Sequence, residues 1–199
     1  MKRQLVIPVL SLASLILFSA PIRSELYIEE SKPIEIFITR PFNYQLTNLK
    51  YLPIIDQQEA WIYHMYLKES SCDWTEINKT NHIGGWQFGR STLKRLGYGH
   101  ITPYKFKRNP NIFPLRTQLQ AVKSLMRIHE MELEPYMGYV VLEREIKGVR
   151  ITKAGLLAGA HLGGAGGVKL FLTSNGEIDL SDGHTRISDY IKEFSIYDF

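Results

Sequence analysis

A helical repeat between two prolines constrains the fold of this chain more than any other feature. A helix can begin at Pro114 and has to end at Pro135, because proline lacks the N–H group that a helix interior needs. One face of that helix would carry residues spaced three or four apart: Leu115, Leu119, Val122, Met126, His129 and Leu133. This spacing predicts an amphipathic helix packed against a core.

Other segments also have helical patterns. Asp56 can cap a helix over residues 57–69, which is apolar on most sides and therefore belongs in the middle of a domain. Thr152 can cap a helix over residues 153–162 that is rich in small side chains. A terminal helix is marked by Ile187, Tyr190, Ile191 and Phe194.

Two glycine-rich runs separate these segments. Residues 84–89 have too much glycine for a helix and predict a tight loop or short hairpin, while residues 163–167 are expected to break the preceding helix. Ser91 is expected to cap a short helix, and a polar connector to cover residues 100–113. We therefore expect one mostly helical α+β domain with a small irregular or β element around residues 73–90.

The N-terminus indicates export. Lys2 and Arg3 precede a short apolar run over residues 5–18, and small residues follow up to Ser24, which is the pattern of a signal peptide over residues 1–24. The run is short for a membrane span, although an uncleaved anchor is the alternative. We expect an exported, periplasmic or extracellular protein with no stable membrane span after cleavage.

The rest of the chain divides in two. Residues 25–53 form a proline-punctuated lead-in with a weak strand pattern, and residues 54–199 form the domain.

Net charge argues against a nucleic-acid partner. The chain has 24 basic and 20 acidic residues, but three of the basic ones lie in residues 1–24, which contain no acid. The remainder is almost neutral, whereas nucleic-acid binders concentrate positive charge on one surface. The basic clusters at 94–95 and 105–108 are interpreted as solvated faces.

A single cysteine limits the covalent chemistry. Cys72 has no partner for an internal disulfide, so the fold has to be held by its core. We interpret Cys72 as a small packed side chain, because a thiol nucleophile would lack an identifiable base. The histidines have no close metal-ligand spacing, so neither a metal nor another cofactor is predicted.

Glu69 is the candidate catalytic acid. Cleavage of a glycosidic bond needs a proton delivered to the leaving oxygen, and a carboxyl group sheltered by apolar neighbours can carry one near neutral pH. Glu69 stands at the end of the expected buried helix and shortly before a glycine-rich loop. Most glutamates at helix ends are simply exposed, so the neighbouring motifs decide the matter.

Two motifs occur in order. The first is Glu69-Ser70, followed by a polar segment, the run Gly84-Gly85-Trp86-Gln87-Phe88-Gly89, and then Ser91-Thr92-Leu93. The second is the small-residue helix that leads through His161 to the glycines of 163–167 and on to Val168. This arrangement resembles the lysozyme-like lytic transglycosylases, over about two thirds of the chain, from Asp56 to Phe194.

The resemblance implies a goose-lysozyme-like domain with a long cleft for the glycan strands of peptidoglycan. Glu69 would be the general acid and later the base, and Gln87 would bind the sugar or hold the loop. The other expected substrate-binding residues are Ser70, Trp86, Phe88, His161 and Gly164. The family's usual tyrosine–asparagine pair is His161-Leu162 here, so the role of that tyrosine passes to His161 or is lost. Alternatively, His161 is a helix-end histidine that bonds a carbonyl group.

A second carboxylate would indicate hydrolysis. Retaining glycosidases place two carboxyl groups about 5–5.5 Å apart, and inverting ones about 6.5–9.5 Å apart. Asp73 and Glu76 lie on the right segment but can equally be solvated loop acids. The resemblance implies one essential glutamate, and a sugar whose own 6-hydroxyl closes a 1,6-anhydro product, so we favour non-hydrolytic cleavage.

Aromatic residues gather near the expected site: Trp74, Trp86, Phe88, Tyr98 and Tyr104. Their rings can stack on sugars or pack the core, and for Trp86 and Phe88 the sequence favours neither. Trp61 is interpreted as core.

Three functions remain open. The chain is a peptidoglycan-cleaving enzyme, a glycan-binding module that kept the cleft without turnover, or a secreted scaffold. We favour the first.

Overall fold

The structure is a computed structural model that describes residues 56–138 and 142–199. The expected signal peptide (1–24) and lead-in (25–53) lie outside the described residues. The described part is mainly helical, as the sequence predicts. Its helices are α1 (Gln57–Ser70), α2 (Arg90–Arg95), α3 (Pro103–Arg108), α4 (Leu115–Leu133), α5 (Lys153–Thr173) and α6 (Ile187–Phe194). Its strands β1 (Glu145–Ile146) and β2 (Val149–Arg150) form an antiparallel hairpin.

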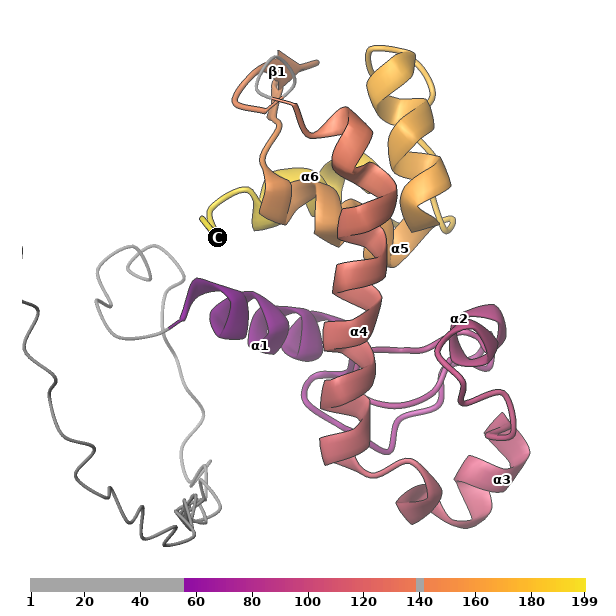
Figure 1. Cartoon of the computed structure of the whole chain (residues 1–199). Coiled ribbons are helices and arrows are strands. Elements are labelled where there is room, and N and C mark those ends of the chain that lie inside the picture. Colours follow the sequence, from indigo (N-terminus) through magenta and orange to yellow (C-terminus); the bar gives the residue numbers. More distant parts are fainter. Residues whose placement is uncertain (1–55, 139–141) are drawn as a thin grey trace, which may run out of the picture. The chain divides into compact units, whose positions relative to one another are not determined.

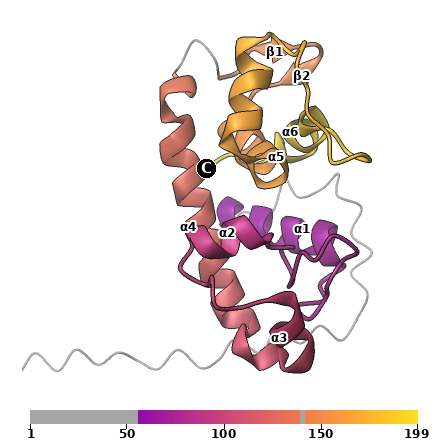
Figure 2. The ribbon, with the colours of Figure 1, turned by 90° about the vertical axis from the view of Figure 1, so that its right-hand side faces the viewer.

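Helix α4 contacts both halves of the described chain. Helices α5 and α6 and the β-hairpin lie toward its C-terminal end, α2 and α3 toward its N-terminal end, and α1 between them (Figures 1 and 2). The predicted start and end of α4 are confirmed: it begins after Pro114 and ends before a short 3-10 turn that contains Pro135. Its buried face includes Val122, Met126 and Leu133.

The predicted ends of α1 and α6 are also close to those observed. The side chain of Asp56 accepts a hydrogen bond from the backbone N–H of Gln58 at 2.8 Å, which confirms the predicted cap. Helix α6 buries the four apolar residues that predicted it. The small β element expected around residues 73–90 is present as isolated bridges that pair Ile83 with Ile77 and with Phe88.

Two local predictions were wrong, and one element was missed. Helix α2 begins at Arg90 after Gly89 as its N-cap, so Ser91 lies inside the helix instead of capping it. The expected connector over residues 100–113 contains α3, which Thr102 caps, and a 3-10 turn. The hairpin β1–β2 was not predicted at all, because strands of two residues carry no readable period.

The second glycine-rich run interrupts its helix, as the sequence predicts. Helix α5 consists of two helical parts that meet in a kink at Gly164, where φ is 69° and ψ is 165°, and the second part continues to Thr173. Positive φ values are available to glycine without steric cost, so this kink can form here. Gly163 and Gly167 pack against Ile187 of α6, where a Cβ atom would lie 2.4 and 2.6 Å from its Cδ1.

The core consists of two clusters along α4. One joins α1, the loop 83–88, the first half of α4 and the face of α6 that carries Phe194, and the other joins the β-hairpin, α5 and Ile187. Within the described residues, α5 is the one helix long and apolar enough to cross a membrane, and 61% of its apolar window is buried inside the protein. That burial is typical of a core helix.

Candidate active site

Glu69 lies in the last turn of α1, directly before the chain reverses. Helix α1 ends at Ser70, and the backbone N–H of its C-cap, Ser71, donates to the carbonyl of Leu67 at 2.9 Å. Ser71 and Cys72 both have positive φ values, of 53° and 66°, which non-glycine residues adopt rarely. The side chain of Ser70 donates back to the carbonyl of Tyr66 at 3.2 Å, so it supports the helix end. Such strained reversals occur often at functional sites.

The carboxyl group of Glu69 is sheltered and anchored on one side. Its side chain is 15% exposed, and Oε1 accepts a hydrogen bond of 2.7 Å from the hydroxyl of Tyr190 on α6. The other oxygen, Oε2, has no hydrogen-bond partner in the described part of the chain, and it is not among the fully buried polar atoms. One oxygen is therefore held in place, while the other is not completely buried.

Helix α6 is fixed against α1 by a set of polar contacts next to this bond. The carboxylate of Glu193 accepts from His64 Nε2 at 3.0 Å and pairs with Lys68 Nζ at 2.7 Å. Because Nε2 of His64 donates, its Nδ1 can accept from the hydroxyl of Tyr197, which lies 3.0 Å away. These contacts hold α6 and the C-terminal residues against α1, next to the bond between Tyr190 and Glu69.

The environment keeps Tyr190 in its protonated, donating form. Burial raises the pKa of its hydroxyl, and the negative charge and hydrogen bond of Glu69 raise this pKa further. The sequence predicted Tyr190 only as a buried residue of α6. Nothing in its local pattern indicated a partner 121 positions away.

His161 joins the two glycine-rich segments. Its Nε2 lies 3.0 Å from the carbonyl oxygen of Trp86, and because a carbonyl can only accept, Nε2–H donates. The same nitrogen lies 4.0 Å from Glu69 Oε1, too far for a hydrogen bond. His161 is therefore a helix-end histidine that bonds a carbonyl group, which was the second of the two alternatives, and it lies beside the carboxylate of Glu69. The hydroxyl group that donates to Glu69 belongs to Tyr190.

The first glycine-rich run is anchored by Gln118 of α4. This side chain is fully buried, and its Oε1 accepts from the backbone N–H of Gly85 at 2.7 Å. Its Nε2 donates to the carbonyls of Trp74 and Phe113, at 2.9 and 2.7 Å. We did not predict a role for Gln118 from the sequence. A glutamine one turn before Val122, on an apolar helix face, could have indicated a buried polar side chain with hydrogen-bond partners.

Gln87 holds the loop, which is one of the two roles expected for it. Its Nε2 donates to the carbonyl of Gly84 at 2.8 Å, and its own φ is 49°. Its Oε1 is buried without a hydrogen-bond partner among the described residues. Gly85 is needed for close packing, because a Cβ atom there would lie 2.2 Å from Cε2 of Tyr66.

The expected stacking role of Trp86 and Phe88 does not fit their burial. Trp86 is 3% exposed, stacks on Tyr66 and donates its Nε1–H to the carbonyl of Ile62; Phe88 is 1% exposed and packs on Phe113. Both side chains belong to the core, as Trp61 does. Their rings are enclosed by protein and have no face for a sugar.

The remaining candidates are dispersed. Asp73 is exposed and uses Oδ1 to accept from the backbone and hydroxyl of Thr75, while Glu76 is exposed without a side-chain partner in residues 56–138 or 142–199. Gly164 forms the kink of α5, with open space where a Cβ would be. The described residues include no group of three or more side chains suited to hold a metal ion.

His129 on α4 predicts a pH dependence of stability. Its side chain is 6% exposed, and burial, followed by the nearby charge of His161, lowers its pKa from 6.5 to about 4. Below pH 6.5 the unfolded chain therefore binds a proton at His129, whereas the folded chain binds it only near pH 4. The contribution of His129 to the free energy of unfolding is complete above pH 6.5, and about 3 kcal/mol of it is lost as the pH falls toward 4.

Urea unfolding at pH 7 and pH 4 measures this loss. We expect His129→Leu to be less dependent on pH over this interval than the native chain, and the exposed control His184→Gln to behave as the native chain does. An equal pH dependence in all three proteins would contradict the assignment to His129.

Comparisons with known proteins find no relative. No protein-family model matches the chain, and neither a curated protein nor a solved structure matches it significantly. The functional argument therefore depends on the residues and their geometry.

Proposed function

We propose that this chain cleaves the β-1,4 glycosidic bond between N-acetylmuramic acid and N-acetylglucosamine in peptidoglycan, in the manner of a lytic transglycosylase. The observation that carries the proposal is the position of the Glu69 carboxyl group and its contacts. This carboxyl group is sheltered at the end of a core helix, with one oxygen held by Tyr190 and the other not completely buried. A general acid needs this combination of a fixed position and one accessible oxygen.

The proposed reaction uses this carboxyl group twice. Glu69 donates its proton from Oε2 to the glycosidic oxygen as the bond from that oxygen to C1 of the N-acetylmuramic acid breaks. The resulting carboxylate then accepts the proton of the 6-hydroxyl group of the same sugar, and O6 bonds to C1 to close a 1,6-anhydro ring. No water is consumed, so a second carboxylate is not required.

The contact between His161 and Trp86 supports the same site. It ties the kinked helix α5 to the glycine-rich loop, 75 positions away in the chain, and His161 Nε2 lies 4.0 Å from Glu69 Oε1. We expect the protein to act outside the cytoplasm, where peptidoglycan lies, and to need no cofactor.

The test is digestion of purified sacculi by the full-length chain, with the released fragments identified by mass spectrometry. Anhydro-muropeptides support the transglycosylase, and reducing ends would indicate a hydrolase instead. Retention on sacculi without any release would favour the alternative, a glycan-binding module.

Tyr190→Phe tests the anchoring of the carboxyl group. Without this hydrogen bond the carboxyl group is no longer held in one position, and a misplaced catalytic group can cost about 100-fold in rate, so we expect kcat to fall about 10- to 100-fold. KM should change less than about twofold, because the hydroxyl contacts Glu69 rather than the glycan. Tyr197→Phe is the matched control, since it deletes a buried hydroxyl that bonds His64 and not Glu69. An equal loss in both variants would indicate a purely structural effect.

A further inference from the structure

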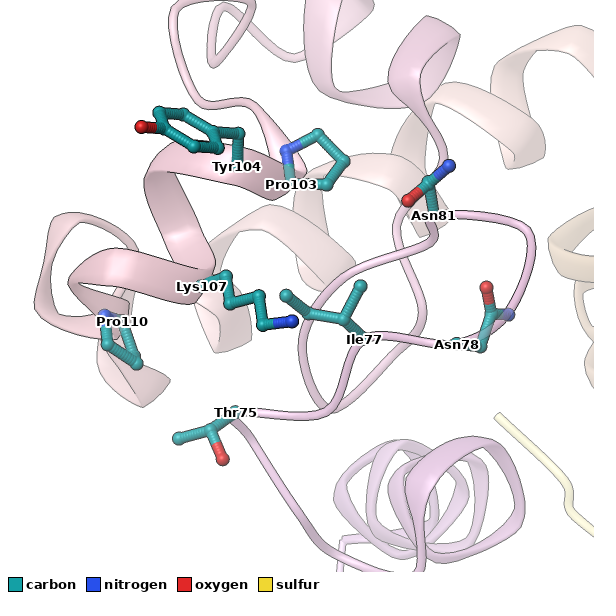
Figure 3. A pocket seen from close by; sticks show the side chains of 8 residues that line it. All are labelled: Thr75, Ile77, Asn78, Asn81, Pro103, Tyr104, Lys107 and Pro110. Carbon is teal, nitrogen blue, oxygen red and sulfur yellow. The ribbon is translucent and has the colours of Figure 1, made fainter.

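A pocket of about 640 Å³ lies between the loop 75–81 and helix α3. This volume is within the range of about 300–1,000 Å³ that is usual for small-molecule sites. Figure 3 shows Lys107 extending from α3 across the pocket toward Ile77, with Asn78 and Asn81 on the opposite loop. Glu69, Tyr190 and His161 do not line the pocket, so it is separate from the candidate active site.

Hydrogen-bond donors dominate the polar lining. Among the described residues, the lining contains one cation, Lys107, and no acidic residue. No ion pair is found for Lys107 in the part of the chain that the structure describes. The Oδ1 atom of Asn78 already accepts from Thr80 and His82, so its amide hydrogens are what it can offer to a ligand. A site with these groups favours a ligand that is negatively charged and rich in acceptors.

The pocket also has an apolar, aromatic wall. Tyr104 is 68% exposed, which is high for a ring of this size, and Pro103 and Ile77 line the pocket with it. Arg108 donates to the Tyr104 hydroxyl at 3.0 Å and thereby holds the ring. An exposed ring fixed in this way can pack against the C–H face of a sugar.

We propose that this pocket binds a saccharide that carries a carboxylate, with the carboxylate at Lys107 and the sugar ring against Tyr104. The identification of the natural ligand as the wall glycan rests on the proposed function, since N-acetylmuramic acid carries such a carboxylate. The binding chemistry itself follows from the lining. Lys105, Lys107 and Arg108 are exposed, as the sequence predicts, and Lys107 also lines the pocket.

Two sugars that differ in the carboxylate test the proposal. The full-length chain carrying Glu69→Gln is titrated with N-acetylmuramic acid and with N-acetylglucosamine, and binding is followed by ¹H–¹⁵N NMR. We expect N-acetylmuramic acid to bind about fivefold more tightly, as for one partly exposed ion pair. The largest shift changes should map to Asn78, Asn81 and Lys107.

Variants assign the preference to this pocket. Lys107→Met should remove the fivefold preference and leave N-acetylglucosamine binding unchanged, while Lys107→Arg should keep most of the preference. Lys79→Met is the matched control, because Lys79 lies on the loop 75–81 beside the pocket but does not line it. Asn81→Asp should remove the preference, because its carboxylate offsets the charge of Lys107, and the backbone, with φ at 64°, suits aspartate as well as asparagine.

Equal binding of the two sugars, or a preference that survives Lys107→Met, would overturn the proposal. The outcome is independent of catalysis. If sacculi are cleaved but the pocket shows no preference, only this inference fails. If the preference depends on Lys107 but the native chain leaves sacculi intact, the cleavage proposal fails and the pocket stands.

Discussion

Glu69→Gln is expected to reduce the release of fragments from sacculi by about 10³-fold, because a glutamine amide cannot donate and recover the proton that the reaction needs. The substitution preserves shape, and its side-chain oxygen can still accept from the Tyr190 hydroxyl. The variant should therefore fold and unfold as the native chain does. Release of soluble muropeptides from labelled sacculi measures the effect, and thermal unfolding confirms that the fold is retained.

Glu76→Gln is the matched control for this loss. Glu76 lies on the loop that follows α1, is exposed and makes no side-chain hydrogen bond within the described residues. If Glu69 is the single catalytic carboxyl group, the activity of Glu76→Gln should stay within about twofold of that of the native chain, and so should the activity of Asp73→Asn. A loss of 100-fold or more in either variant would indicate a second catalytic carboxylate and hydrolysis. Full activity in Glu69→Gln would remove the basis of the proposed function.

Gln118→Ala is expected to lower the free energy of unfolding by about 3–5 kcal/mol. The native side chain bonds the backbone N–H of Gly85 and the carbonyls of Trp74 and Phe113, all in one fully buried position. Alanine leaves these three groups without their partner, and each unsatisfied buried group costs about 1–3 kcal/mol. Urea unfolding at pH 7 measures the loss.

Gln120→Ala is the matched control. Gln120 is two residues further along α4, exposed and without a hydrogen bond to the described chain. Its substitution should change the unfolding free energy by less than about 0.5 kcal/mol. We also expect Gln118→Ala to lose activity at temperatures where it remains folded, because the loop 84–87 loses its link to α4. Equal stability of the two variants would show that Gln118 does not anchor the loop.

The sequence predicted those elements whose signals are local. The prolines around α4, the Asp56 cap of α1 and the apolar spacing of α6 each act within a few residues, and the structure has these helices where they were expected. The position of Glu69 at the end of a core helix was predicted for the same reason. The break in α5 was also predicted from its glycines, whereas the space that Gly163 and Gly167 provide for Ile187 of another helix was not.

By itself, then, the sequence determined the main helices, the end of α1 at which Glu69 lies and the presence of two glycine-rich segments. Only the tertiary structure decided which hydroxyl group holds the carboxyl group, which side chain anchors the loop and whether Trp86 and Phe88 face a ligand or the core. These are contacts between residues far apart in the chain, such as Tyr190 with Glu69 and Gln118 with Gly85. The physical reason is that local patterns determine which face of an element is buried, whereas the partner on that face depends on how the elements pack together.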